Sequence, residues 1–423
     1  MYLGNPPVVN ASRLVYDAYA TQGQTVITPP GGYTVGQVEV IINGSQLSAD
    51  DFTATDGSTI VLAQGMGLND TIKIVAYGTF AVANTYSQAQ VDAKVAEVNS
   101  NIALIGPQFK NRIINGGMTI SQRGTSFTSA GAYSLDRWYQ NVPTPSSFSV
   151  SQSSTAPAGF TKSLAVTVTT GGTIGGAANY LVQFIEGNNV ADLSFGTSSA
   201  STITISFWVR SSVTGTFGGA LRNSAVSPAT SFRSYPFTYS ISASNTWEYK
   251  TVTITGDGTA GAGQWNTDTS ASFSLFFDLG SGAVTGTAGA WAGANAVGAT
   301  GTQTSLMTTN GATFYITGVQ LEKGSTATSF DYRPYGTELA LCQRYYEAGE
   351  ATLYMANMVG PYLFVPYKVD KRAAPTVIRT DNGAISGDTS SSTVTAAGAR
   401  GFYFVKSGTT YAVGGGWTAS AEL

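Results

Sequence analysis

The sequence predicts an all-β protein, and three observations support that prediction. Short runs of alternating apolar and polar residues recur along the chain, separated by Gly, Ser, Thr and Asn. Glycine supplies 50 of the 423 residues, about 12%, against about 7% in an average protein. Tyr, Phe and Trp number 22, 20 and 6, which is far more aromatic side chains than a disordered chain carries. We expect a small N-terminal β-sandwich, a short trimeric coiled-coil helix, a central jelly-roll sandwich and a C-terminal β tip domain.

Composition excludes several classes of function. The chain has no histidine, which excludes Ser-His-Asp and Cys-His catalysis and histidine metal ligands. A net charge of −3 argues against binding to a nucleic-acid backbone. The single cysteine, Cys342, excludes a disulfide within the chain. We expect no cofactor and no metal centre, and only a structural calcium ion held by Asp and carbonyl oxygens stays open.

The sequence also bears on where the protein is found. Residues 1–7 lack the basic and apolar regions of a signal peptide. No apolar run approaches the roughly 18 residues of a membrane span. We therefore expect synthesis in the cytoplasm and no membrane insertion. The protein would then either stay there or leave by a route other than secretion, such as assembly into a virus particle released by lysis.

Residues 1–84 are expected to form the small N-terminal β domain. Val38, Val40 and Ile42 recur at every second position and are followed by Asn43-Gly44. This is a strong hairpin signal, because a type I′ turn needs positive φ at both central residues. A second hairpin is expected around residues 56–57, and a further strand over 71–77.

Residues 85–110 change from a period of two to a helical period. Val91, Val95, Val98, Ile102 and Ile105 follow a 4-3-4-3 spacing, which is a heptad seam. A helix this short is marginal alone in water, so the seam predicts partner helices. β-branched residues at both seam positions disfavour a parallel dimer, and a trimer is the favoured interpretation. The alternative is an amphipathic helix packed on its own domain.

Residues 111–335 are expected to be the jelly roll and residues 336–423 the C-terminal tip. β runs in the first part cover 163–168, 201–209, 249–254 and 272–277, and residues 280–311 read as a long loop. The tip opens with a short helix over 338–346, followed by strands at 362–365, 376–378 and 402–405. No fixed repeat is visible, which counts against a solenoid or a β-helix.

Two stretches of sequence carry a resemblance to a known family. The first is Asn-Arg-Ile-Ile-Asn-Gly-Gly-Met-Thr-Ile-Ser-Gln-Arg-Gly-Thr at 111–125, followed by Leu-Asp-Arg-Trp at 135–138. The second comprises 316–324, 327–330, 332–335 and 338–346. Together they bracket about half of the chain and resemble the jelly-roll module of bacteriophage tail fibres, which is itself similar to carbohydrate-binding modules.

The resemblance implies a homotrimeric fibre that is part of the virion. Residues 1–84 would attach it to the phage tail or to an adaptor or baseplate protein, and the C-terminal end would face the host. The ligand class that follows from the resemblance is a cell-surface polysaccharide or lipopolysaccharide.

Candidate ligand-binding residues follow from the side chains that commonly bind sugars. Aromatic rings stack on the C–H face of a pyranose, and cations beside aromatics suit anionic groups. Two tryptophans lie in loop-like sequence, and the tip supplies three aromatic residues and two cations. The predicted ligand-binding set is Trp265, Trp291, Tyr403, Tyr411, Trp417, Lys371 and Arg372. For each of these the alternative is packing, either beneath a loop, at a subunit interface or in a core.

Three functions are compatible with these observations. Non-enzymatic adhesion is favoured, and no catalytic residue is predicted. A tailspike-like depolymerase would need two carboxylates, which work without histidine, but the nine acidic residues of 111–335 offer no obvious pair. A purely structural tail or baseplate component is the third possibility.

Overall fold

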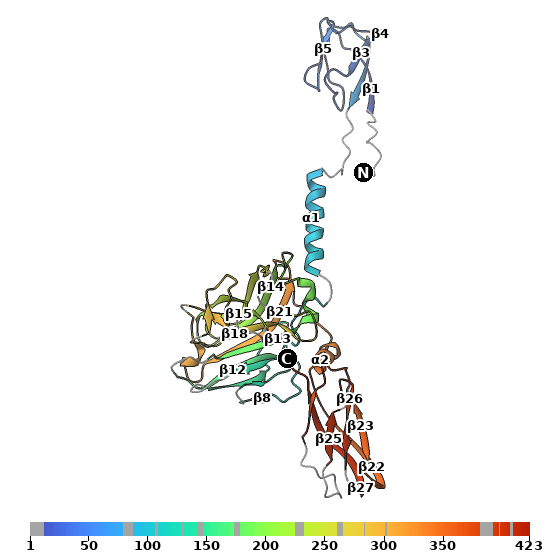
Figure 1. Ribbon diagram of the computed structural model, residues 1–423. Coiled ribbons are helices and arrows are strands. Elements are labelled where there is room, and N and C mark those ends of the chain that lie inside the picture. The colour runs from blue at the N-terminus through green and yellow to red at the C-terminus, as the bar shows by residue number, and fades with distance from the viewer. Residues whose placement is uncertain are drawn as a thin grey trace. The chain divides into compact units, whose positions relative to one another are not determined.

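The computed structural model describes residues 12–78, 88–105, 109–128, 131–141, 147–172, 178–224, 232–259, 265–282, 284–300, 303–380, 392–396, 398–406 and 409–423. The described residues form mainly antiparallel sheets together with two α-helices, which confirms the predicted fold class. The chain divides into two compact units, Met1–Asn99 and Ser100–Leu423. Figure 1 follows the elements in chain order.

The first unit contains two small sheets that share one core. The four-stranded sheet consists of β1 (Ser12–Tyr19), β7 (Thr71–Gly78), β3 (Val38–Ile42) and β4 (Ser45–Gln46), in that order. The three-stranded sheet consists of β2 (Val26–Ile27), β6 (Ile60–Leu62) and β5 (Phe52–Thr53). Val40, Ile60 and Ile74 are at most 1% exposed and belong to the core between these strands.

The predicted Asn-Gly hairpin is confirmed. Asn43 and Gly44 have φ values of 52° and 81°, and they join β3 to β4. The second hairpin is also confirmed, because β5 pairs antiparallel with β6 across the turn that contains residues 56–57. Local turn chemistry alone was sufficient to predict both.

Helix α1 (Gln88–Ile105) lies where the heptad pattern predicts it. Val91, Val95 and Val98 are 42%, 52% and 51% exposed in the single chain. The side chains of Ile102 and Ile105 lie outside the described residues. Among the described residues, these three valines form an exposed apolar stripe along α1.

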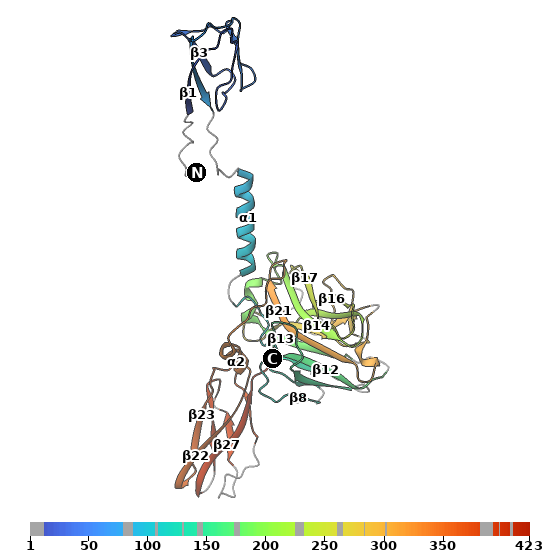
Figure 2. The ribbon, with the colours of Figure 1, turned by 180° about the vertical axis from the view of Figure 1, so that it is seen from behind.

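The central sandwich consists of two six-stranded sheets, seen from opposite sides in Figures 1 and 2. One sheet, here called the outer sheet, is ordered β16 (Ser234–Ile241), β15 (Gly215–Asn223), β18 (Ala271–Asp278), β13 (Tyr180–Glu186), β10 (Tyr139–Asn141) and β9 (Ala132–Tyr133). The other, here called the inner sheet, is ordered β17 (Glu248–Ile254), β14 (Ile203–Ser211), β21 (Thr313–Lys323), β12 (Ser163–Thr170), β11 (Ser147–Ser153) and β8 (Ser126–Phe127).

The core of the sandwich lies between these sheets, because alternate residues of each strand point to it. Phe207 of the inner sheet packs edge-on against Phe277 of the outer sheet, with ring centroids 5.0 Å apart. Trp138 is fully buried, and its Nε1–H donates to the Asn115 carbonyl oxygen at 3.2 Å.

The predicted loop over 280–311 is only partly a loop. It contains two short parallel strands, β19 (Thr285–Gly286) and β20 (Gly298–Ala299), and a 3₁₀ turn at Leu306–Thr308. Val297, Leu306 and Met307 are buried. A Gly- and Ala-rich sequence gives little periodic signal, so the sequence could not show that this segment covers part of the outer sheet.

The C-terminal domain packs two three-stranded sheets on each other. It follows helix α2 (Tyr335–Gln343). One sheet is ordered β22 (Tyr346–Val359), β27 (Thr409–Ser420) and β24 (Thr376–Arg379), and the other β23 (Tyr362–Pro366), β26 (Gly401–Val405) and β25 (Thr393–Ala396). Phe402, Phe404 and Trp417 are among the core residues between them.

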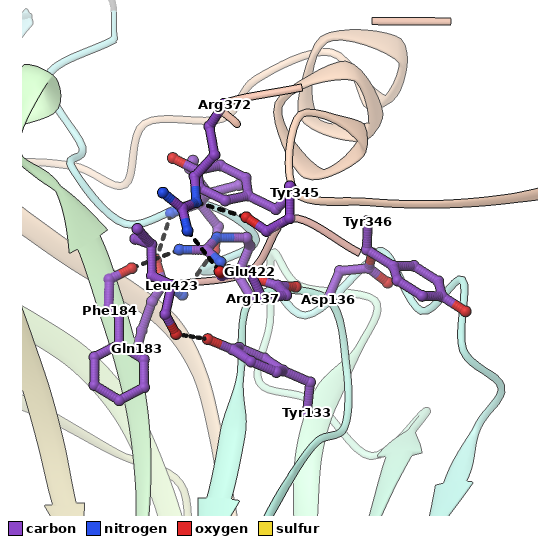
Figure 3. A network of polar contacts seen from close by, with 12 residues as sticks. Tyr133, Asp136, Arg137, Gln183, Phe184, Tyr345, Tyr346, Arg372, Glu422 and Leu423 are labelled. Carbon is purple, nitrogen blue, oxygen red and sulfur yellow. Dashed lines mark hydrogen bonds and ion pairs between the residues drawn. The ribbon is translucent and has the colours of Figure 1, made fainter. Parts of the chain in front are cut away.

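A buried ionic network joins this domain to the central sandwich (Figure 3). The Arg137 side chain is 1% exposed and its guanidinium lies 3.6 Å above the Tyr345 ring. It donates to the Glu422 carboxylate and, at 2.6 Å, to the Phe184 carbonyl oxygen. Arg123 donates to the same carboxylate at 2.8 Å. Residues 285 positions apart in the sequence therefore meet in one charge cluster.

Arg137→Met is expected to lower the stability of the second unit by roughly 3–5 kcal/mol, because it leaves a buried carboxylate without its main partner. Thermal unfolding followed by circular dichroism measures the loss. Arg400→Met is the matched control, since the Arg400–Asp370 pair is exposed and such pairs contribute about 0–1 kcal/mol. Equal effects of the two changes would contradict this role for Arg137.

Asp278 gives the outer sheet a predictable pH dependence. The side chain is 2% exposed, and burial raises the pKa of its carboxyl from 3.8 to about 6, with hydrogen bonds from Gly280 and Ser281 opposing the rise. The folded state holds this proton to higher pH than the unfolded state does. The stability that this carboxyl contributes, about 3 kcal/mol, is therefore fully present below about pH 4 and is lost as the pH rises through about 6.

Asp278→Asn is expected to remove this fall, so the variant gains stability relative to the natural chain between pH 4 and 6. Unfolding midpoints measured from pH 4 to 8 test this. Asp268→Asn is the control: hydrogen bonds from Ser270 lower the pKa of Asp268, so that change acts with the opposite sign and below pH 4. A pH profile that Asp278→Asn leaves unchanged would refute the assignment.

Candidate functional site

The two loop tryptophans of the predicted set meet in the structure. The rings of Trp265 and Trp291 pack edge-on with centroids 5.6 Å apart, and Phe195 lies 4.9 and 5.9 Å from them. The Trp291 Nε1–H donates to the Thr255 carbonyl oxygen at 2.7 Å. Both rings are half-buried against the sandwich core. They are used in packing, and a part in ligand binding stays a prediction.

Trp417 and Lys371 are buried in the C-terminal domain. Trp417 is 4% exposed and packs on Phe402 at 5.1 Å between centroids. Lys371 is 3% exposed, and its Nζ donates to the Glu347 carboxylate at 2.6 Å. Burial lowers the pKa of Lys371. Direct contact of these two side chains with a ligand, as the sequence suggested, does not fit this burial; they hold the domain together.

Arg372 lies at the junction with the central sandwich. Its guanidinium donates to the carbonyl oxygens of Thr269 at 3.0 Å, Glu422 at 2.7 Å and Ala421. These contacts connect the C-terminal end of the chain to the loop before β18. Arg372 therefore stabilises the junction between the C-terminal domain and the central sandwich.

Tyr403 lies on an exposed aromatic face. Tyr362, Phe364 and Tyr403 are 68%, 46% and 40% exposed and come from the paired strands β23 and β26. We call these three residues the distal aromatic face. The Phe364 and Tyr403 rings are 5.1 Å apart. The side chain of Tyr411 lies outside the described residues.

A pocket of about 200 Å³ lies where the first and last sequence segments of the central sandwich, residues 111–119 and 330–338, meet. Three aromatic rings form one wall: Phe160 lies 5.0 Å from Phe330 and 5.5 Å from Tyr332, and the last two lie 4.9 Å apart. Tyr332 is 60% exposed, and we call this site the aromatic pocket. It is lined by Asn111, Gly116, Gly117, Thr119, Gly159, Phe160, Thr161, Phe330, Asp331, Tyr332, Arg333 and Glu338.

Two glycines allow the chain to form this pocket. A Cβ at Gly116 would lie 2.1 Å from the Val319 carbonyl oxygen, so only glycine lets this segment lie against β21. Gly159 has a φ of +89°, and its carbonyl oxygen accepts the Tyr332 hydroxyl at 3.0 Å. That hydrogen bond fixes the exposed ring at the rim. Partial burial raises the pKa of Tyr332.

The opposite wall of the aromatic pocket is polar. Arg333 lies between Asp331 and Glu338, with N–O distances of 3.5 and 3.4 Å. The backbone N–H of Asn111 donates to Asp331 at 3.3 Å, and that of Asn115 donates to Glu338. The two carboxylates therefore share one arginine and backbone donors. Both carboxylates line the pocket while they hold these contacts.

The resemblance found in the sequence includes part of this lining, at 111–119, 330, 332–333 and 338, but the sequence did not predict a site there. The closely spaced pair Phe330 and Tyr332, with Asp331 between them, was the available signal, because adjacent aromatic and acidic residues are typical of sugar sites. Phe160 could not have been added, since it lies 170 positions away from Phe330.

Within the described ranges, no group of three or more Asp, Glu or Cys side chains is placed to hold a metal ion. No helix of the described chain is both long and apolar enough to cross a membrane.

The solved structures that are similar to about half of this chain include the following three. The enzymatically active domain of tailspike protein 4 from bacteriophage CBA120 is 15% identical with a TM-score of 0.28, and the match covers 51% of this chain and 22% of that one. A family 11 carbohydrate-binding module from Clostridium thermocellum, in complex with a mixed-linked tetrasaccharide, is 12% identical with a TM-score of 0.26 and is covered to 98%, against 48% of this chain. The N-terminal cellulose-binding domain of a Cellulomonas fimi β-1,4-glucanase is 12% identical with a TM-score of 0.26, and the match covers 49% of this chain and 99% of that one.

No protein-family model matches the sequence, and no curated protein does. The structure is thus similar to carbohydrate-binding modules and to a domain of a phage tailspike, at low identity. All three TM-scores are well below 0.5, so what this chain binds has to be inferred from its own side chains.

Proposed function

We propose that this chain binds a glycan without cleaving it and that the aromatic pocket is its sugar site. The observation that supports this proposal is the pairing of a wall of three aromatic rings with a wall of two carboxylates and a guanidinium. The ring wall suits the C–H face of a pyranose, and the polar wall suits its hydroxyls.

The size of the pocket bears on what it would hold. Pockets for drug-sized ligands have volumes of about 300–1,000 Å³. The aromatic pocket, at about 200 Å³, is smaller. It suits a single sugar ring, such as a terminal residue or a branch of a polysaccharide, better than a long stretch of chain.

We further propose that the protein is a homotrimeric tail fibre of a phage virion, attached through residues 1–84 and directed at host-surface polysaccharide or lipopolysaccharide. The resemblance of residues 111–125 and 316–346 to tail-fibre modules supports this assignment. The exposed stripe of Val91, Val95 and Val98 supports a multimer, since the two partner helices of a trimer would cover it. The distal aromatic face offers a second contact surface toward the host.

The two alternatives differ in observable ways. A depolymerase would release reducing ends from host polysaccharide, and a purely structural tail or baseplate part would not compete with phage adsorption. The shared arginine between Asp331 and Glu338 favours binding over cleavage.

Tyr332→Ala is expected to weaken binding to host polysaccharide at least tenfold, because stacking on an aromatic ring contributes on the order of 1 kcal/mol or more and the ring also forms the rim of the pocket. Binding to immobilised polysaccharide measures the change. Tyr332→Phe keeps the ring and should retain most of the affinity.

Tyr335→Ala is the matched control for that experiment. Tyr335 is 65% exposed, lies three residues away at the start of α2 and does not line the pocket. Equal affinity of the Tyr332→Ala and Tyr335→Ala proteins would show that the sugar binds elsewhere.

The protein is expected to have a solution mass close to three times the 43.8 kDa of one chain. Val95→Asp places a charge in the predicted seam and should shift the mass toward one chain, whereas Ala93→Asp, on the opposite side of the helix, should not. Sedimentation measurements distinguish these outcomes. A monomeric natural chain would refute the trimer.

A further inference from the structure

The face of the outer sheet that points away from the core carries its own aromatic cluster. Phe276 lies at its centre, with the Tyr180 ring edge-on at 5.0 Å. Val182 and Val297 pack against Phe276, and all three are at most 3% exposed. This cluster is separate from the sandwich core, because alternate residues of β13 and β18 point to opposite sides of the sheet.

Arg222, on β15, lies over this cluster. Its guanidinium carbon lies 4.6 Å from the Phe276 ring centroid and 4.9 Å from that of Phe232. One Nη donates to the Asn295 side-chain oxygen. No carboxylate of the described residues forms an ion pair with it, and its Nε is buried with no acceptor. Burial lowers the pKa of Arg222 to about 10.

A second polar group without a hydrogen-bond partner lies on the neighbouring strand. Ser234 is the register partner of Arg222 across β15 and β16, so the two side chains lie on the same face of the sheet. Ser234 is fully buried, and its Oγ has no hydrogen-bond partner among the described residues. Its backbone pairs with Ala292 in the segment that covers this part of the sheet.

A half-buried cation without a carboxylate partner and a buried hydroxyl without a hydrogen-bond partner are both unfavourable, and the cost falls when an acceptor binds. A guanidinium presents planar N–H donors that match the oxygens of a carboxylate or a phosphate. Neutral hydroxyls would satisfy the hydrogen bonds but leave the charge unpaired. An oxyanion satisfies both requirements.

We propose that Arg222 and Ser234 form a binding site for an oxyanion carried by the glycan, either the carboxylate of an acidic sugar or the phosphate of a phosphorylated one. This inference rests on the proposed function and adds the chemical class of ligand to it. Neither residue lines the aromatic pocket, so the two sites can be tested separately.

The first experiment uses inorganic phosphate and the full chain. Phosphate is expected to raise the unfolding midpoint of the natural protein in a buffer without other oxyanions, and Arg222→Met should abolish that rise, since methionine keeps an apolar side chain over Phe276 without the charge. Ser234→Ala should reduce the rise. A rise in Arg222→Met equal to that of the natural chain would overturn the site.

Arg210→Met is the matched control. Arg210 lies on β14 of the inner sheet, 4.9 Å from the Tyr315 ring centroid, and its Nε already donates to the Asn245 carbonyl oxygen at 2.9 Å. This variant should respond to phosphate as the natural chain does. If Arg210→Met loses the response as fully as Arg222→Met, the effect is general charge screening and the site is refuted.

The second experiment compares oligogalacturonate with its methyl ester, and glucose 6-phosphate with glucose, by calorimetry. The acidic member of at least one pair is expected to bind at least tenfold tighter, and Arg222→Met should reduce it to the affinity of the neutral member. The pair that responds identifies the source of the oxyanion.

Equal affinities within both pairs, while host polysaccharide still binds in a Tyr332-dependent way, would refute this inference and leave the proposed function standing. A phosphate response without binding of any glycan would refute the proposed function and keep the oxyanion site.

Discussion

The Arg137 guanidinium, enclosed by the Tyr345 ring and the Glu422 carboxylate, is the interaction on which the second unit depends. Arg137 belongs to the beginning of the central sandwich, Tyr345 to the entry into the C-terminal domain and Glu422 to its exit. Burying a charge is costly unless it is paired, and the ion pair with Glu422 and the hydrogen bond to the Phe184 carbonyl oxygen offset that cost for Arg137. The C-terminal end of the chain is held in the same place, because the Tyr133 hydroxyl donates to the Leu423 carbonyl oxygen at 2.8 Å (Figure 3).

The geometry of the aromatic pocket depends on contacts between the same two parts of the chain, the start of the central sandwich and the segment that follows it. The backbone of Asn115 donates to Glu338, and Arg333 donates to the carbonyl oxygen of Ile113 at 3.2 Å. The first residues of the sandwich and the first helix after it therefore hold each other directly behind the pocket. The polar wall therefore connects the two ends of the sandwich and also lines the pocket. Under the proposed function, the positions of these polar groups would be set before a sugar binds, and binding would require little further ordering.

Sequence reasoning predicted the features that depend on neighbouring residues. Alternation marked the strands, Asn43-Gly44 marked a turn, and the valine spacing marked α1. It could not predict features that depend on distant residues. Lys371 reads as a surface cation until Glu347 is found beside it, and Trp265 and Trp291 read as exposed until each is found to cover the other. The oxyanion site was equally invisible, since nothing local shows that Arg222 lacks the carboxylate that most buried arginines have.

The structure shows how the small number of charged residues in this chain is used. A chain with 45 charged residues in 423 has few to place, and the structure uses several of them inside, in the pairs around Glu422, Glu186 and Glu347. Exposed aromatic rings such as those of the distal aromatic face remain on the surface and, under the proposed function, suit a hydroxyl-rich ligand through many weak contacts. Arg222, which forms no ion pair with a carboxylate of the described residues, would then be a selective element. It would add little to binding of neutral sugars, and it would separate acidic polysaccharides from the neutral ones that the rest of the surface accepts.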